Sequence, residues 1–218
     1  MGLSTKCTSK KEVYGIVGID FIAGPTEILI ISDDTGNAEL IAADLLAQAE
    51  HDPNARSNLI TTSRKLAKNV NKEISIQLAN LKTKDIAKKS LEKSRLIIVK
   101  DLNDAIEISN RRAPEHLELH VKMPDLLIPK LRNYGSLFID KYSAEVFGDY
   151  CSGINHILPT NGTARYTGGL SVKDFIKVLT YQKISKEKSE EMIKIASKIA
   201  EIEGLDAHKK AALIRSEQ

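Results

Sequence analysis

The sequence predicts an α/β fold with a largely parallel sheet, followed by a small helical appendage. Short β-branched runs alternate with stretches of helical spacing between residues 27 and 140, and this alternation is typical of parallel sheets. After about Leu170 the sequence shows helical patterns and no strand pattern. The chain has 218 residues, of which 42% are hydrophobic and 28% charged. Such a chain is long and apolar enough to bury a core.

Strands are expected where short apolar runs are bounded by turn residues. The run E-I-L-I-I-S at 27–32 is the pattern of a buried strand, because it is continuous and rich in Ile. An earlier apolar stretch, 13–22, is interrupted by Gly15 and Gly18. The expected strands cover residues 27–32, 58–62, 95–100, 116–121 and 136–140.

Helices are expected where apolar residues recur every three or four positions. The stretch 63–82 has this spacing in its apolar set, Leu66, Val70, Ile74 and Leu78. Gly204 follows the stretch 185–203 at the place of a C-cap glycine. Helices as short as those expected after residue 170 are marginal alone, so this appendage must dock on something. The expected helices cover residues 37–50, 63–82, 101–111, 124–134 and 185–203.

Composition argues against several classes of protein. The net charge is +3, the basic residues are scattered, and aromatic residues make up 5% with no Trp, so no nucleic-acid partner is expected. No run approaches 18 apolar residues, and residues 1–11 lack an apolar signal core, so neither a membrane span nor a secretory signal is expected. Cys7 and Cys151 suggest no disulfide framework, and a reducing cytoplasm is the expected location. One local basic stretch is expected to be a solvated helix face: Lys88, Lys89, Lys93 and Arg95.

Two residues at the end of the first expected helix could together coordinate a metal ion. Gln48 and His51 lie three residues apart, so their side chains share one side of the helix. An imidazole and an amide oxygen suit a divalent cation. A His at a helix end also suits capping or a surface position, and spacing alone leaves both interpretations open.

Two polar motifs follow farther along the chain. Glu115-His116 enters an expected strand, and a carboxylate beside an imidazole suits acid–base chemistry, although a solvated strand edge would look the same. The segment 148–156 (G-D-Y-C-S-G-I-N-H) brings a carboxylate, a hydroxyl, an amide and an imidazole into one loop. Such a loop is either a site or a long surface turn.

A last motif, E-G-L-D-A-H at 203–208, places Glu203 and His208 around a break between helices. A helix junction with capping residues is the other interpretation. Four of the five His lie in these four motifs, and only His120 lies outside them. Together they offer a mixed oxygen and nitrogen ligand set suited to zinc or a similar divalent ion: Gln48, His51, Asp149 and His208.

Five motifs occur in an order that resembles the histidinol dehydrogenase family. The resemblance extends from about Glu12 to the C-terminus, and it rests on V-G-I-D-F-I-A-G-P-T-E-I-L at 17–29, A-D-L-L-A-Q-A-E-H-D at 43–52, R-A-P-E-H-L-E-L at 112–119, G-D-Y-C-S-G-I-N-H-I-L-P-T at 148–160 and E-G-L-D-A-H at 203–208.

The resemblance implies roles for these residues. Glu115 and His116 match the family's acid–base pair, with His116 as general base and Glu115 activating water. One zinc ion per site would orient the substrate. Its implied ligands are Gln48, His51, Asp149 and His208. The implied substrate contacts are Thr26, His116, His156 and Glu203, together with the four metal ligands.

The implied reaction is the last step of L-histidine biosynthesis. L-histidinol becomes the aldehyde and then L-histidine through two hydride transfers to NAD. The family is a homodimer, in which the C-terminal helices reach into the partner's site, so Glu203 and His208 would serve the other subunit.

The resemblance also implies an incomplete Rossmann-like parallel sheet layered with helices, plus a small C-terminal helical domain. The expected domains are residues 1–25, the end of the nucleotide-binding domain, then 26–170, with most of the site, and 171–218, the helical tail. The family's chains are longer at the N-terminus, and their NAD contacts have no counterpart here. Residues 1–11 (M-G-L-S-T-K-C-T-S-K-K) do not resemble the family. This chain alone is therefore expected to be poorly soluble or to need a partner.

Two other functions follow from the same residues. One is a zinc- or histidinol-binding protein without catalytic activity. The other is a zinc hydrolase that activates water with Glu115 and His116. The ligand set also tolerates manganese or cobalt in place of zinc.

Overall fold

The computed structural model describes residue 12 and residues 23–217. The whole of the apolar stretch 13–22 and residues 1–11, including Cys7, therefore lie outside the described residues. The chain divides into two compact units, Met1–Phe175 and Ile176–Gln218. Among the described residues, no helix is both long and apolar enough to cross a membrane.

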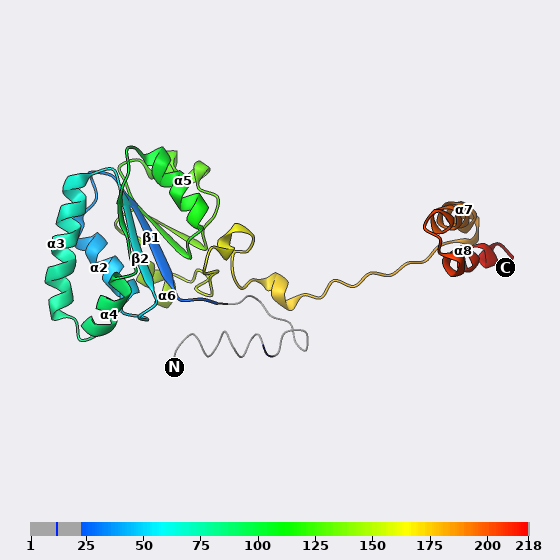
Figure 1. The fold of residues 1–218 in the computed structure, drawn as a ribbon, viewed down its shortest axis with the longest axis horizontal. Helices are drawn as coiled ribbons and strands as arrows, with labels where there is room; N and C mark the ends of the chain where they lie inside the picture. The colour runs from blue at the N-terminus through cyan, green and yellow to red at the C-terminus, as the bar shows by residue number, and fades with distance from the viewer. Residues whose placement is uncertain (1–11, 13–22, 218) are drawn as a thin grey trace. The chain divides into compact units, whose positions relative to one another are not determined.

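The first unit is built around one five-stranded sheet in which every neighbouring pair is parallel (Figure 1). The strand order β3-β2-β1-β4-β5 places β1 at the centre, between β2 and β4. This arrangement confirms the α/β fold with a parallel sheet. The strands are β1 (Glu27–Ser32), β2 (Arg56–Thr61), β3 (Leu96–Ile98), β4 (His116–His120) and β5 (Ser136–Ile139).

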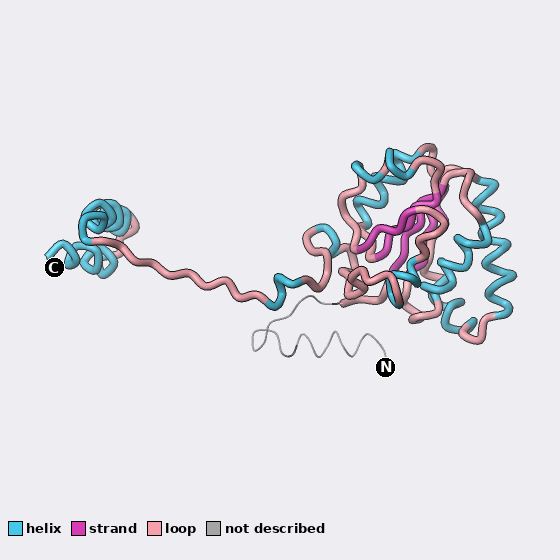
Figure 2. The backbone as a smooth tube through the Cα atoms, turned by 180° about the vertical axis from the view of Figure 1, so that it is seen from behind, coloured by secondary structure: helices cyan, strands magenta, loops and turns pink. Residues whose placement is uncertain are grey.

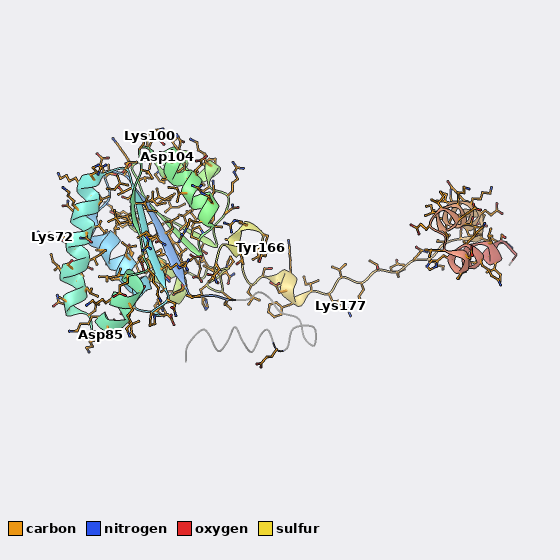
Figure 3. The ribbon with its side chains drawn as sticks, in the orientation of Figure 1. Lys72, Asp85, Lys100, Asp104, Tyr166 and Lys177 are labelled. Carbon is orange, nitrogen blue, oxygen red and sulfur yellow. The ribbon has the colours of Figure 1, made fainter. Side chains whose placement is uncertain are left out.

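Helices cover both faces of the sheet (Figure 2). On one face Ile28 and Ile30 pack with Ile41 of α2 and Val70 of α3. On the other face Leu29 packs in a second cluster with residues of α5. Surface positions carry charges that point into solvent, as Lys72 and Asp85 do in Figure 3. The helices of this unit are α2 (Ala38–Ala49), α3 (Arg64–Asn80), α4 (Lys84–Leu91), α5 (Leu102–Arg112) and α6 (Glu145–Tyr150).

Capping residues in the sequence fix the starts of two helices. The Asn37 side chain accepts hydrogen bonds from the N–H groups of Glu39 and Leu40, which begins α2. Asp101 does the same for α5. The C-cap residue of that helix is Ala113, which has a left-handed φ of 51° and is followed by Pro114. The chain thereby turns out of the helix and enters β4 at His116.

The helix expected over 124–134 is wrong. The structure has two short 3₁₀ helices there, Pro124–Leu126 and Ile128–Lys130. Pro129 lies inside the second one. Proline has no N–H to donate and its ring clashes with the preceding turn, so a continuous α-helix cannot pass through this position. Helix α4 lies in the local basic stretch, and Lys88 and Lys89 are exposed on it, as expected for a solvated helix face. The helix ends at Leu91, so the prediction is wrong for Lys93 and Arg95, which are exposed beyond it.

The second unit is a helical hairpin. It consists of α7 (Lys186–Ile202) and α8 (Asp206–Leu213), with a 3₁₀ turn at Ile214–Glu217. Gly204 adopts a φ of +70° just after α7, as the sequence predicts for a C-cap glycine. Two apolar residues of α7, Ile193 and Ala200, are buried within the unit.

Candidate functional site

The candidate site lies where three segments meet at the amino-terminal ends of β1 and β4. Thr26 immediately precedes β1, and Glu115 immediately precedes β4. These two strands are neighbours in register, with Ile28 opposite His116. Helix α2 runs back to this edge of the sheet, so Gln48 lies in its last turn near the same point.

A hydrogen-bonded chain joins the side chains at this edge. The Thr26 hydroxyl donates to Oε2 of Glu115 at 2.6 Å, and it accepts from Nε2 of Gln48 at 2.5 Å. The Glu27 N–H donates to the same Glu115 oxygen at 3.0 Å. The remaining polar atom of Gln48, Oε1, is buried without a hydrogen-bond partner among the described residues. This carbonyl oxygen is therefore free to coordinate a cation.

His116 is held on the buried side of the site. Its side chain is 5% exposed, and Nδ1 lies 3.2 Å from the carbonyl oxygen of Glu27. A proton on Nδ1 would be donated to that carbonyl, which leaves the lone pair on Nε2. Nε2 lies 3.6 Å from Oε1 of Glu145. The ring also packs against Phe138, with 6.0 Å between the ring centroids.

Burial changes the proton affinities of these groups. It lowers the pKa of His116 to about 4 and raises the pKa of Glu115 to about 7. It also raises the pKa of Glu145 to about 8, and the nearby Asp149 carboxylate adds to this rise. At neutral pH the His116 imidazole is therefore uncharged, as a proton acceptor must be.

Asp149 reaches the site from α6. Its carboxylate, an oxygen of Glu145 and a nitrogen of His116 lie within 4.8 Å of one another. Helix α6 packs tightly here, because a Cβ added at Gly148 would lie only 2.8 Å from the Phe138 ring. The side chain of Asp149 is half-buried and that of Glu145 is buried.

The structure brings only part of the expected set into contact. His51 is exposed just beyond α2, close enough to His116 to oppose its protonation. His156 is exposed in the loop after α6, and its side chain makes no hydrogen bond or ion pair to a described residue. Glu203 and His208 are exposed at the junction of α7 and α8 in the second unit. Their roles in the site stay predictions.

Sequence reasoning missed Glu145. It lies four residues before Asp149, so the two carboxylates share one side of a helical turn, and this spacing could have indicated the pair. The buried strand β4 was also misjudged as a possible solvated edge. All five of its residues are buried, including Glu118 and His120.

The described residues fit a divalent cation such as zinc. The unpartnered Oε1 of Gln48 would offer one neutral oxygen, Asp149 a carboxylate and His51 an imidazole. This mixed set is within the range of zinc, manganese and cobalt chemistry.

Comparison with known proteins gives one family over nearly the whole chain. The family model described as histidinol dehydrogenase matches residues 6–216. The histidinol dehydrogenase of Methanocaldococcus jannaschii is 48% identical over 204 residues, which are 94% of this chain and 47% of the relative. That of Lactococcus lactis is 45% identical over 212 residues, which are 97% of this chain and 49% of the relative.

A solved structure agrees with these relatives. The crystal structure of histidinol dehydrogenase from Elizabethkingia anophelis matches with a TM-score of 0.85 and 40% identity, over 97% of this chain and 49% of that one. The chain thus spans about half the length of the relatives it matches.

Proposed function

The chain belongs to the histidinol dehydrogenase family, a family of oxidoreductases, and from that premise we propose that it takes part in the zinc-dependent, NAD-linked oxidation of L-histidinol to L-histidine. The observation that carries this proposal is the meeting of Thr26, Gln48, Glu115 and His116 at one edge of the sheet, with Asp149 beside them. These residues come from four motifs that are distant in the sequence, and packing alone gives no reason for them to meet around the unpartnered buried oxygen of Gln48. A shared ligand accounts for the convergence.

We assign zinc to Gln48, His51 and Asp149, with His208 contributed by the helical tail of a second subunit. When bound, the ion orients the imidazole and amine of the substrate. The 2.5 Å hydrogen bond between the Thr26 hydroxyl and the Gln48 amide fixes the orientation of both side chains. Because Nε2 of Gln48 is committed to that bond, Oε1 is the atom presented to the ligand.

We assign the proton transfers of the reaction to His116 and Glu115. With Nδ1 of His116 donating to the Glu27 carbonyl, Nε2 would accept the hydroxyl proton of L-histidinol. With NAD bound as the hydride acceptor, the carbon that bears this hydroxyl would give up a hydride. In the second oxidation, Glu115 takes a proton from the water that attacks the aldehyde. With a second NAD bound as hydride acceptor, the hydrated aldehyde would be oxidised to L-histidine.

The remaining parts of the proposal concern partners. His156 and Glu203 would contact the substrate, and Glu203 would come from the second subunit of a homodimer. NAD would be the hydride acceptor in both oxidations. We expect the protein in the cytoplasm, because Cys7 and Cys151 suggest no disulfide framework.

The first test is binding rather than turnover. The full chain is titrated with zinc and then, with zinc bound, with L-histidinol, and heat is recorded by calorimetry. We expect one zinc per chain and histidinol binding only after zinc. The Gln48→Ala variant should lose most zinc affinity, whereas Gln77→Ala, a surface glutamine that donates to the Glu39 carbonyl, should match the unsubstituted chain.

NADH formation from L-histidinol and NAD then separates the candidates. NADH at a steady turnover supports the dehydrogenase. Zinc and histidinol binding without NADH supports a binding protein without catalytic activity. Absence of both kinds of binding would contradict the proposed site.

A further inference from the structure

We propose that Glu118 is a positioning residue, which holds helix α6, and with it Asp149, against the metal and substrate site. The proposal rests on the proposed function, since Asp149 is there a zinc ligand. Glu118 touches neither the substrate position nor the proposed ligands directly. It acts through helix α6, which carries the proposed ligand Asp149.

The geometry of β4 places Glu118 directly behind the site. His116, Glu118 and His120 alternate along the strand, so they share one face of the sheet. On the neighbouring β1 the partners on that face are Ile28 opposite His116 and Ile30 opposite Glu118. Glu118 is only 1% exposed, and a carboxylate that deep needs hydrogen-bond partners.

One carboxylate oxygen of Glu118 caps the first turn of α6. Oε1 of Glu118 accepts a hydrogen bond from the backbone N–H of Glu145 at 2.9 Å. The residue before it, Ala144, has no side chain that could cap the helix. Helix α6 has only six residues, too few to be stable alone. The contact from Glu118 therefore fixes where this short helix starts and where Asp149, in its last turn, ends up.

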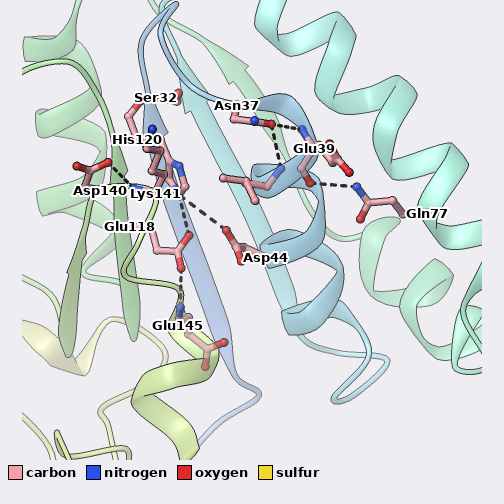
Figure 4. A network of polar contacts seen from close by, with 11 residues as sticks. Ser32, Asn37, Glu39, Asp44, Gln77, Glu118, His120, Asp140, Lys141 and Glu145 are labelled. Carbon is pink, nitrogen blue, oxygen red and sulfur yellow. Dashed lines mark hydrogen bonds and ion pairs between the residues drawn. The ribbon is translucent and has the colours of Figure 1, made fainter. Parts of the chain in front are cut away.

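The other carboxylate oxygen ties the same residue to the rest of the framework. Oε2 of Glu118 lies 3.3 Å from Nε2 of His120, and that nitrogen lies 3.8 Å from Oδ2 of Asp44 on α2 (Figure 4). The backbone carbonyl of His120 accepts from the Ser32 hydroxyl at 2.8 Å. Asp44 lies one turn before Gln48 on α2. The network thus links all three elements that carry the site: α2, β4 and α6.

Such a network resembles the outer hydrogen bonds that orient metal ligands, whose loss weakens metal binding by about 10- to 100-fold. The inference gives a specific expectation. Removing Glu118 should disturb α6 and the metal site more than an equally destabilising change elsewhere.

The test compares three variants of the full chain: Glu118→Ala, Glu118→Gln and Val70→Ala. Val70 is buried in the apolar core on α3 and takes no part in these polar contacts, so it controls for general loss of stability. Two measurements are made on each: hydrogen–deuterium exchange at residues 145–150, and affinity for zinc, with the visible spectrum of bound cobalt as a report on ligand geometry.

We expect Glu118→Ala to speed exchange in α6 at least about tenfold, to weaken zinc binding about tenfold or more, and to alter the cobalt spectrum. Glu118→Gln keeps an oxygen for the Glu145 N–H and should stay close to the unsubstituted chain in both. If Glu118→Ala does not fold, Glu118→Asp, whose carboxylate is one methylene shorter, should show the same selective loss.

Equal effects of Glu118→Ala and Val70→Ala would overturn the proposal, as would failure of Glu118→Gln to preserve α6. If the unsubstituted chain binds no zinc, the proposed function fails at its metal site. In that case exchange in α6 alone decides the role of Glu118.

Discussion

The hydroxyl of Thr26 and the carboxylate of Glu115 are joined by a 2.6 Å hydrogen bond, across 89 positions of sequence. The bond spans the starts of two neighbouring parallel strands, so it closes the edge of the sheet where the candidate site lies. The same hydroxyl accepts a hydrogen bond from the amide nitrogen of Gln48. Thr26 therefore orders the proposed acid–base residue Glu115 and the proposed metal ligand Gln48 at once.

Replacing Thr26 with Val should destabilise the fold. The substitution keeps the shape of the side chain but leaves the Gln48 amide and one Glu115 hydrogen bond unsatisfied in a buried place. We expect a loss of about 1–3 kcal/mol in the free energy of unfolding, measured by urea denaturation. Thr26→Ser keeps the hydroxyl and is the matched control. Equal stability of the Val and Ser variants would show that the hydroxyl contributes nothing.

Replacing His116 with Asn should separate chemistry from binding. Asn fills part of the space of the ring without supplying a base at the Nε2 position. We expect histidinol oxidation, measured in a preparation that shows NADH formation, to fall by about 100- to 10,000-fold. Zinc affinity should change by less than about threefold, because His116 is not among the proposed ligands. A variant with unchanged turnover would remove His116 from the proton steps.

The stability of the metal-free chain should depend on Asp44 near neutral pH. Burial raises the pKa of this carboxyl to about 7 from 3.8, and the negative Glu118 adds to the rise, while His120 opposes it. The folded state therefore holds the proton more tightly than the unfolded state. The stabilisation that comes from this bound proton is complete below about pH 4 and is lost as the pH rises through about 7.

The free energy of unfolding should thus fall between about pH 4 and pH 7, and Asp44→Asn should remove part of that fall, at least about 1 kcal/mol. Denaturant unfolding at a series of pH values measures both slopes. Glu115 and Glu145, whose pKa values burial also raises, keep some of the dependence in the variant. Parallel curves for the two proteins would show that Asp44 is not protonated in the fold.

Local pattern was enough to predict most of the framework. The strand expected at 27–32 matches β1 at both ends, since a short run rich in Ile and bounded by turn residues favours a buried strand over a helix. The helix expected over 37–50 matches α2 because Asn37 caps it. Pro129 was the overlooked signal in 124–134, where apolar spacing suggested a helix that the proline ring forbids.

The polar face of β4 could not be predicted, because alternation of His and Glu with Leu usually marks a strand with one wet face. Its burial depends on α2 and α6, which pack over it from distant parts of the chain. Glu145 was missed for the same reason: its meeting with His116 is a property of the packed fold. The second unit cannot be related to the first from helical spacing, so Glu203 and His208 stay predictions.

The two ends of α2 should behave independently. Asn37 caps the first turn through hydrogen bonds of 2.9 and 3.3 Å to the N–H groups of Glu39 and Leu40, whereas Gln48 lies in the last turn at the site. Asn37→Ala should cost about 0.5–2 kcal/mol of unfolding free energy, measured by thermal or urea denaturation. Asn37→Asp retains a capping oxygen and should stay near the unsubstituted chain. Zinc affinity should be unchanged in both, because β1 and α3 hold the body of the helix in place. A loss of zinc binding in Asn37→Ala alone would mean that the whole helix, rather than its last turn, sets the position of Gln48.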